Sequence, residues 1–200
     1  MNKPIDISAV VLQTPRLTLR PWRQTDLEDF YEYARVDGVG QMAGWLPHQS
    51  IDETKKILAS FIARKKTFSL EYLGKVIGSL GVEKYKEEHY PELAELEGRE
   101  IGYVLSKAYW GQGLMPEAVQ AVIRYLFDRE NLDFLLVGHF EWNRQSARVI
   151  EKCGFQYIES LDHTTRFETV ERTRDYILYS PRKVIRQARQ YDLKNESICE

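Results

Sequence analysis

The sequence is poor in the residues that hold a fold together through covalent bonds or metal ions. Two of its 200 residues are cysteine, Cys153 in a helical pattern and Cys199 near the C-terminus. Two cysteines so placed give no disulfide framework, and we expect both to be reduced thiols in an intracellular, cytoplasmic protein. The four histidines are scattered. None stands at helical spacing from another histidine, a cysteine or a carboxylate, as zinc ligands usually do, so we expect no metal site.

The sequence also lacks long hydrophobic runs and a strong charge of either sign. No stretch approaches the roughly 20 apolar residues that a membrane span needs. Asp6 and Gln13 interrupt the N-terminal region, which therefore does not resemble a signal peptide. The net charge of −2 gives no particular attraction for nucleic acid or an anionic membrane. We expect neither of these among its partners.

What is present fits one globular domain. The hydrophobic fraction of 43% is enough for a sizeable core, and 29% of the residues are charged. We predict a single domain over residues 1–181, with Pro181 ending its last strand and residues 1–15 forming a loosely held lead-in. Residues 182–200 are predicted to be a C-terminal tail or a short docking helix, because Val184, Ala188 and Tyr191 recur at helical spacing.

The most informative stretch is a glycine turn at residues 109–117, YWGQGLMPE. A predicted strand, residues 100–105, precedes it, and a predicted helix from Pro116 to about Glu130 follows it. Gly111 and Gly113 let the backbone turn tightly without a Cβ beside a ligand, and Pro116 suits the first helical position. Several unpaired N–H groups then point from one helix N-terminus, an arrangement that binds phosphate.

The remaining patterns alternate between strands and helices. The predicted order along the chain is strand, two helices, three strands, helix, strand, helix and two strands. The predicted strands are residues 16–20, 68–72, 76–82, 100–105, 134–140, 155–161 and 174–179. The run at 134–140 is nearly all apolar, as in a strand buried on both faces.

Three helix starts carry capping signals. Thr25 with Glu28 and Ser50 with Glu53 both fit the capping box, in which the first side chain caps the helix and the glutamate reaches back. Asn143 is a good cap for a helix at residues 144–153.

Two connecting segments have two interpretations each. Residues 38–49 are rich in large apolar groups, and Trp45 is predicted either to fill the core or to form part of a wall or lid that binds a substrate. Residues 83–100 contain seven glutamates against three basic residues. This run is either a solvated loop or an acidic rim that attracts a cationic amine.

Three segments of the chain resemble the GNAT superfamily of acyl-CoA-dependent N-acyltransferases, in particular its RimJ/RimL-like branch of ribosomal-protein N-terminal acetyltransferases. They are residues 14–21 (TPRLTLRP), the run from EIGYVL at 100–105 through the glycine turn, and residues 143–155 (NRQSARVIEKCGF). The resemblance covers about residues 14–181. It implies an α+β fold with a central mixed, mostly antiparallel sheet of about seven strands, helices on both faces and a splay between the fourth and fifth strands.

The resemblance also implies acetyl-CoA as the cofactor and a primary amine as the acceptor. The cofactor pyrophosphate is expected on the turn residues Gly111, Gln112, Gly113, Leu114 and Met115. Backbone N–H groups at Val104 and Leu105 are expected to polarise the thioester carbonyl. Gly102 and Gly138 fit a close approach of pantetheine between the splayed strands, and Asn143 is expected to hold a pantetheine amide.

Three positions depart from the superfamily pattern. Trp110 stands where arginine or glutamine is usual, although tryptophan is familiar in this branch. Met115 stands where a glycine or alanine is usual, and we expect its side chain to point away from the cofactor. Ile150 stands where many members carry a general-acid tyrosine. Ser146 lies one helical turn earlier on the same face, so we predict that it hydrogen-bonds the departing thiolate.

Glu100 is the predicted general base and lies at the predicted acceptor side. Glu141 and His139 are the alternatives. Strand alternation places Glu100, Gly102 and Val104 on one face of the sheet, but the sequence leaves open which face looks at the acceptor.

The predicted function is therefore an acetyl-CoA-dependent N-acetyltransferase acting by direct attack of a primary amine, such as a protein N-terminus, a polyamine or another small amine. The alternative is a non-catalytic acyl-CoA-binding sensor. A nucleotide-phosphate loop is disfavoured, because the lysine and serine or threonine that normally follow such a loop are absent. The resemblance allows either a monomer or a homodimer.

Overall fold

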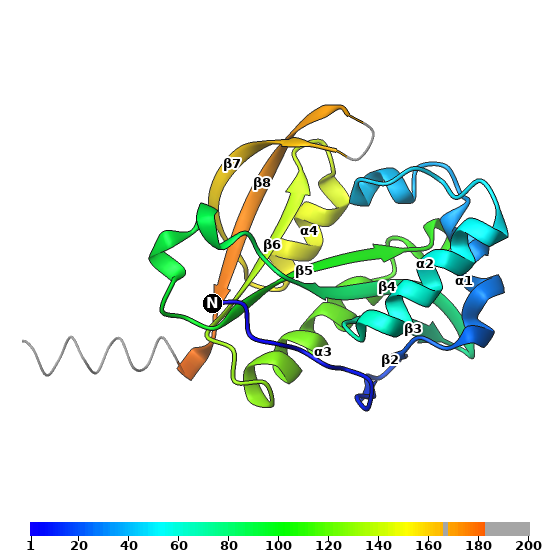
Figure 1. The fold of residues 1–200 in the computed structure, drawn as a ribbon, viewed down its shortest axis with the longest axis horizontal. Coiled ribbons are helices and arrows are strands. Elements are labelled where there is room, and N and C mark those ends of the chain that lie inside the picture. Colours follow the sequence, from blue (N-terminus) through cyan, green and yellow to red (C-terminus); the bar gives the residue numbers. More distant parts are fainter. Residues whose placement is uncertain (166–167, 183–200) are drawn as a thin grey trace, which may run out of the picture.

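An eight-stranded sheet forms the centre of the computed structural model, which describes residues 1–165 and 168–182 (Figure 1). The strand order is β1-β2-β3-β4-β5-β6-β8-β7, and every neighbouring pair is antiparallel except β5 and β6. The strands are β1 Leu12–Gln13, β2 Leu17–Pro21, β3 Thr67–Tyr72, β4 Lys75–Glu83, β5 Gly98–Leu105, β6 Phe134–Phe140, β7 Gln156–Thr164 and β8 Val170–Tyr179. The predicted mixed, mostly antiparallel sheet is confirmed, with one strand more than expected.

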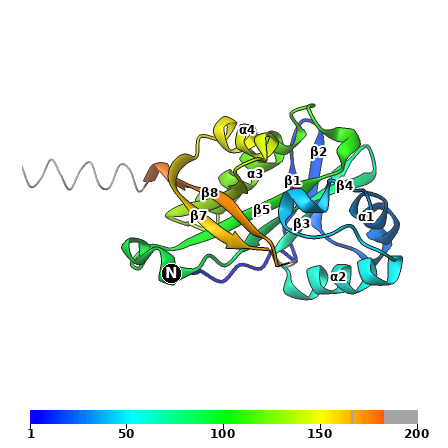
Figure 2. The ribbon, with the colours of Figure 1, turned by 90° about the horizontal axis from the view of Figure 1, so that it is seen from above.

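Helices cover both faces of this sheet, as predicted. Figure 2 shows α1 and α2 on one side and α3 and α4 on the other. Their bounds are α1 Leu27–Ala34, α2 Ile51–Arg64, α3 Leu114–Asp128 and α4 Arg144–Lys152. Among the described residues, five short 3-10 helices lie between these elements, η1 Gln24–Asp26, η2 Gly40–Ala43, η3 Glu87–His89, η4 Pro91–Leu93 and η5 Lys107–Tyr109. Within the described residues, no helix has the length and apolar character needed to cross a membrane.

The N-terminal segment is packed against the domain, and the prediction of a loose lead-in is wrong. Ile7 is fully buried in the core, and its N–H donates to Lys65 O at 2.8 Å. Leu12 and Gln13 pair with β2 and supply the additional strand. The burial of apolar Ile7 explains why this segment is ordered.

The two faces of β5 enter different clusters. Ile101 and Leu105 belong to the main core with α3 and α4, whereas Val104 packs with α1 and α2 residues. By alternation, Glu100 and Gly102 share the face of Val104. The sequence left open which way the face with Glu100 looks. It is the face whose Val104 packs with α1 and α2.

β5 and β6 separate after a short stretch of parallel pairing. Gly98, Arg99 and Glu100 pair with residues 134–136 of β6, and the pairing ends there. Figure 1 shows β6 turning away from β5 beyond this point. The predicted splay is therefore confirmed, between β5 and β6 in the observed numbering.

Two predicted helix starts are wrong in detail. α3 begins at Leu114, with Gly113 as its N-cap at φ +75°. Pro116 is therefore its third residue, where a missing N–H still costs no intrahelical hydrogen bond. Thr25 does not cap α1, because residues 24–26 form η1 and the Asp26 side chain instead accepts from Arg23 N–H at 2.8 Å.

The other two capping signals are confirmed. Ser50 accepts from Glu53 N–H at 3.2 Å at the start of α2. Asn143 Oδ1 accepts from Ser146 N–H at 3.0 Å at the start of α4. These two helices therefore begin at the residues that the sequence marked.

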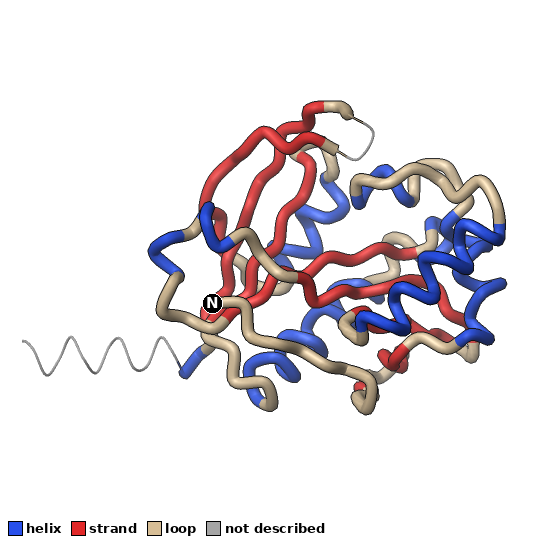
Figure 3. Tube along the Cα trace, viewed as in Figure 1, coloured by secondary structure: helices blue, strands red, loops and turns tan. Residues whose placement is uncertain are grey.

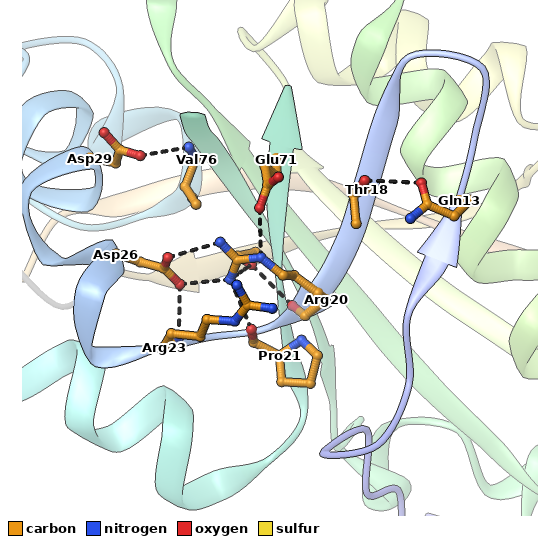
Figure 4. A network of polar contacts seen from close by, with 10 residues as sticks. Gln13, Thr18, Arg20, Pro21, Arg23, Asp26, Asp29, Glu71 and Val76 are labelled. Atoms are coloured by element: carbon orange, nitrogen blue, oxygen red, sulfur yellow. Dashed lines mark hydrogen bonds and ion pairs between the residues drawn. The ribbon is translucent and has the colours of Figure 1, made fainter. Parts of the chain in front are cut away.

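A buried ion network attaches α1 to the sheet (Figure 4). Two guanidinium nitrogens of Arg20 on β2 contact the two carboxylate oxygens of Asp26 at 2.8 and 2.9 Å. Arg20 Nε donates to Glu71 Oε2 on β3 at 2.7 Å. Arg20 and Asp26 are each only 5% exposed, so this charge-assisted pairing occurs away from water.

The glutamate-rich segment is not simply a solvated loop. It forms η3 and η4 beside β7 and β8, as Figure 3 shows. Tyr85, Tyr90 and Leu93 are buried there against Phe134 and other apolar residues. The aromatic residues between the glutamates therefore pack the segment against the sheet.

The C-terminal hairpin of β7 and β8 is longer than predicted at both strands. The predicted tail or docking helix at 182–200 falls almost wholly on residues 183–200, outside the described residues, as does Cys199. Cys153 is half-buried, and burial raises the pKa of its thiol to about 11.

Candidate functional site

Two cavities meet at the splay between β5 and β6. The larger has a volume of about 330 Å³ and lies between β5, β6, β8 and η2. The smaller, of about 80 Å³, lies between the end of β5 and the first turns of α3 and α4. Met42, Tyr103 and Ser146 line both cavities. A molecule bound in one cavity can therefore reach a molecule bound in the other at these three residues.

The glycine turn presents free backbone donors beside the smaller cavity. Within the described residues, no hydrogen bond uses the N–H of Gly111, Gln112 or Gly113. Leu114 and Met115 open α3, where N–H groups have no intrahelical acceptor. Both glycines have positive φ, +76° and +75°, and a Cβ at Gly111 would meet nothing within 4 Å. The turn therefore leaves N–H groups open to an acceptor, as in loops that bind anions.

Arg16 braces this turn from outside, a role that the sequence did not indicate. Its Nη1 donates to Gln112 O at 2.9 Å. Its Nε donates to Glu117 Oε2 on α3 at 2.7 Å. The turn is therefore held by the residue directly before β2, which lies 96 positions before Gln112 in the chain.

The end of β5 presents a backbone donor to the gap. Ser106 N–H donates to Ile77 O of β4 at 2.7 Å, and N–H directions alternate along a strand. Leu105 N–H therefore points away from β4 into the gap, whereas Val104 N–H points toward β4. Both N–H groups were predicted to polarise the thioester carbonyl, but only that of Leu105 is directed to the gap. Val104 lines the smaller cavity, although its N–H does not point there.

Trp110 explains how the turn tolerates the departure from the superfamily pattern. Its indole Nε1 donates to Leu105 O at 2.8 Å and so ties the turn to the end of β5. Met115 is 5% exposed and packs in the main core, but it also lines the smaller cavity. Its side chain therefore forms part of the cavity wall, where the sequence led us to expect it to point away.

Ser146 is held at the junction of the cavities by the first turn of α4. Its Oγ lies 2.8 Å from the hydroxyl of Tyr103 on β5, and the same hydroxyl lies 3.3 Å from Ser146 O, so the contact between the two hydroxyls is the shorter one. Ile150, at the position of the missing tyrosine, is 1% exposed in the core. Tyr103 was not singled out from the sequence, because alternation placed it with the core residues Ile101 and Leu105.

Glu100 lines the larger cavity and is half-buried there. Burial, with smaller contributions from Asp175 and Glu83, raises its pKa to about 7, against an opposing effect of Lys86. A carboxyl group with such a pKa can accept a proton near neutral pH. This is the property that a general base needs.

Asp175 on β8 is the second carboxylate of the larger cavity. Its Oδ2 accepts from the Tyr90 hydroxyl at 2.8 Å. Its side chain lies over Gly138, since a Cβ there would come within 2.7 Å of Asp175 Oδ1. Gly138 thus makes room for a carboxylate, whereas a Cβ at Gly102 would meet nothing within 4 Å. No sequence pattern pointed to Asp175.

The two alternative bases lie in different surroundings. His139 is buried, lines the larger cavity, and has its Nδ1 2.7 Å from Phe140 O and its Nε2 3.2 Å from the Tyr176 hydroxyl. Glu141 is paired with Arg174 at 2.7 Å on the exposed surface. Glu141 does not line either cavity.

Trp45 is half-buried and packs in the cluster formed by α1 and α2. Its ring lies 5.0 Å from that of His48 and closes over Gly40, where no Cβ would fit. Met42 and Ala43 are the residues of this segment that line the larger cavity. Across the described residues, no cluster of histidine, cysteine, aspartate and glutamate is arranged to hold a metal ion.

Comparison with known proteins identifies the family to which this sequence is similar. The Acetyltransferase (GNAT) domain family matches residues 16–156. The probable N-acetyltransferase YjcK of Bacillus subtilis is 46% identical over 55 residues, which are 28% of this chain and 30% of that protein. The match therefore spans less than a third of YjcK. The uncharacterized N-acetyltransferase p20 of Bacillus licheniformis is 28% identical over 153 residues, 72% of this chain and 82% of that protein.

Solved structures share the fold at low sequence identity. A GNAT-family acetyltransferase of Bacillus anthracis has a TM-score of 0.75 and 22% identity, covering 86% of this chain and 99% of that one. RimL, the ribosomal L7/L12 alpha-N-protein acetyltransferase, in complex with coenzyme A has a TM-score of 0.71 and 15% identity. The match covers 85% of this chain and 98% of that one. The microcin C7 self immunity acetyltransferase MccE, in complex with acetyl-CoA and AMP, has a TM-score of 0.70 and 15% identity. The match covers 83% of this chain and 93% of that one.

Proposed function

The chain belongs to the GNAT acetyltransferase family, and from this premise we propose that it transfers an acetyl group from acetyl-CoA to a cationic primary amine. One observation carries the proposal. The smaller cavity is lined by Trp110 and Met115 on either side of the glycine turn, the larger contains a carboxyl group with a pKa of about 7, and the two meet at Tyr103 and Ser146. A donor and an acceptor can thus be brought together at one point.

The acetyl end of acetyl-CoA lies at the smaller cavity and its pyrophosphate on the turn, and when bound it supplies the activated acetyl group. The N–H groups of residues 111–115 hold its pyrophosphate, assisted by the N-terminal dipole of α3. Leu105 N–H polarises the thioester carbonyl from the edge of β5. RimL and MccE have structures with coenzyme A and acetyl-CoA, respectively, which supports this assignment of the donor.

The larger cavity receives the amine. Glu100 and Asp175 place two carboxylates against one lysine, Lys86, in its wall, and the third carboxylate, Asp162, is paired with Arg172 at 3.1 Å. This balance attracts a positively charged acceptor. Glu100 takes the proton that the ammonium must lose before its nitrogen attacks, while Asp175 orients the acceptor.

Ser146 hydrogen-bonds the sulfur of coenzyme A as it departs. Its hydroxyl stands where both cavities meet, and its backbone N–H is already held by Asn143. A hydrogen bond from Ser146 Oγ stabilises negative charge on the thiolate as the thioester breaks.

The proposal is tested with acceptors matched in length and different in charge. Thiol release from acetyl-CoA is followed with 1,4-diaminobutane, 1-aminobutane and 4-aminobutanoate, and with a peptide that has a free N-terminus. We expect turnover, with kcat/KM falling from the diamine to the neutral-ended amine to the carboxylate. Tight coenzyme A binding without turnover on any amine would instead support the alternative, a non-catalytic sensor. Turnover that is fastest with 4-aminobutanoate would refute the cationic acceptor site.

A further inference from the structure

Tyr103 supplies a hydroxyl where the superfamily's helical tyrosine is missing. Ile150 occupies that helical position and is buried in the core, so α4 offers no phenol there. The Tyr103 side chain comes from β5 and reaches across to the first turn of α4. The hydroxyl group at the junction of the cavities therefore comes from a different element of the fold.

The geometry makes Tyr103 the partner of Ser146. The two hydroxyl oxygens are 2.8 Å apart, and the Tyr103 hydroxyl also lies 3.3 Å from Ser146 O. A phenol is a stronger hydrogen-bond donor than an aliphatic alcohol, so the favoured arrangement has Tyr103 donating to Ser146 Oγ. The single hydrogen of Ser146 is then free for another acceptor.

The surroundings keep this arrangement in place. Burial raises the pKa of Tyr103, although the hydrogen bond with Ser146 opposes the effect, so the phenol stays protonated at neutral pH. Ser146 is 8% exposed, and its N–H is fixed by Asn143 Oδ1 at 3.0 Å. The serine is thus held from the backbone side by Asn143 and from the hydroxyl side by Tyr103.

We propose that Tyr103 is a positioning residue for acetyl transfer, whose O–H donates to Ser146 Oγ and directs the serine hydrogen at the sulfur of coenzyme A. The inference rests on the proposed function. Glu100 takes the ammonium proton before attack, and in the transfer step the amine nitrogen bonds to the carbonyl carbon. The C–S bond breaks, its electron pair stays on sulfur, and the Ser146 hydrogen bond stabilises the thiolate until it takes the second proton, which the nitrogen releases as the amide forms. No proton leaves Tyr103.

The test is a double-mutant cycle of Tyr103→Phe and Ser146→Ala, followed by thiol release with the best amine. Because a positioned donor of this kind contributes about 100-fold to the rate, Ser146→Ala is expected to lower kcat by roughly that factor. Loss of one orienting hydrogen bond, about 1.4 kcal/mol, corresponds to a tenfold decrease for Tyr103→Phe. If Tyr103 acts through Ser146, the double variant is no slower than Ser146→Ala alone.

Separate readouts distinguish this role from a structural one. The KM for acetyl-CoA and the Kd for coenzyme A are expected to stay within twofold of the wild type in Tyr103→Phe. Tyr125→Phe is the matched control, because Tyr125 on α3 also donates its hydroxyl to one partner, Glu130, and lines neither cavity; its kcat should be unchanged.

Three results would overturn the inference. They are a kcat of Tyr103→Phe equal to the wild type, multiplicative losses in the double variant, or a parallel loss of coenzyme A binding. Absence of thiol release by the wild-type protein with every amine would instead be a failure of the proposed function.

Discussion

The side-chain amide of Asn143 joins α4 to η2 across the site, because its Nδ2 donates to Met42 O at 3.1 Å while its Oδ1 accepts from Ser146 N–H at 3.0 Å. The residue therefore caps a helix and holds a wall of both cavities at once. An amide has a second hydrogen and a second lone pair. Only these remain for the contact with pantetheine that the sequence led us to predict.

Asn143→Asp separates the two roles. The carboxylate still accepts from Ser146 N–H and suits a helix N-terminus, but it cannot donate to Met42 O. We expect α4 to remain folded, amide hydrogens of residues 40–45 to exchange faster, and the KM for the amine to rise severalfold. Ser50→Ala is the control, since it removes the cap of α2 at a cost of about 1 kcal/mol without touching either cavity. Unchanged exchange in Asn143→Asp would contradict the tether.

The acid side of the pH–rate profile is predicted to report Glu100. The base must be deprotonated to act, and its pKa is about 7, so kcat/KM should rise with pH through neutrality. Asp175→Asn removes one of the negative charges that raise this pKa. The rise should therefore move to lower pH in Asp175→Asn and disappear in Glu100→Gln. A profile of Glu100→Gln that keeps the wild-type rise would exclude Glu100 as the base.

The same carboxyl group is predicted to make folding stability depend on pH. Its folded-state pKa of about 7 lies above the ordinary value of 4.5, so between these values the folded protein holds a proton that the unfolded chain has released. Stability therefore falls as pH rises through this window, by at most roughly 3–4 kcal/mol at 1.36 kcal/mol for each pH unit. Glu100→Gln should be more stable than the wild type at pH 8 and similar at pH 4.5. Denaturant unfolding at the two pH values measures the difference.

Gly111 and Gly74 form a matched pair for testing the turn. Their φ angles are +76° and +80°, and a Cβ at either would meet nothing within 4 Å. Alanine should destabilise the protein by about 1–2 kcal/mol at each position, because both backbones are left-handed. Only the Cβ at residue 111 would cover the free N–H groups. We expect the Kd for coenzyme A to increase at least tenfold in Gly111→Ala and to stay unchanged in Gly74→Ala, as titration calorimetry would show. Equal affinities would place the pyrophosphate elsewhere.

The parts of the site that could be predicted from sequence are local in the chain. The turn needs Gly111 and Gly113 beside a helix start, and the α4 cap needs Asn143 three residues before Ser146. Both signals lie within one turn of backbone. The boundary of α3 was misplaced, because Pro116 is compatible with either the first or the third helical position.

The parts that could not be predicted depend on register between distant strands. Asp175 reaches the larger cavity because it pairs opposite Gly138 on β6, and Tyr103 reaches Ser146 because β5 and α4 are brought together by the sheet. Nothing in the local pattern of either strand identifies the opposing residue. A shift of the β6–β8 register by one residue would turn Asp175 to the other face.

Arg20 gives the sharpest test of how α1 is held to the sheet, since it pairs with Asp26 beside α1 and with Glu71 on β3. Arg20→Met leaves Asp26 buried without its partner, and removing one member of such a pair typically costs about 3–5 kcal/mol. Arg172→Met is the control, because its pair with Asp162 is exposed and worth at most about 1 kcal/mol. Adding Asp26→Leu to Arg20→Met should recover part of the loss, since the remaining buried charge is then removed. If urea unfolding gives the two arginine variants the same stability, the buried network does not hold α1 in place.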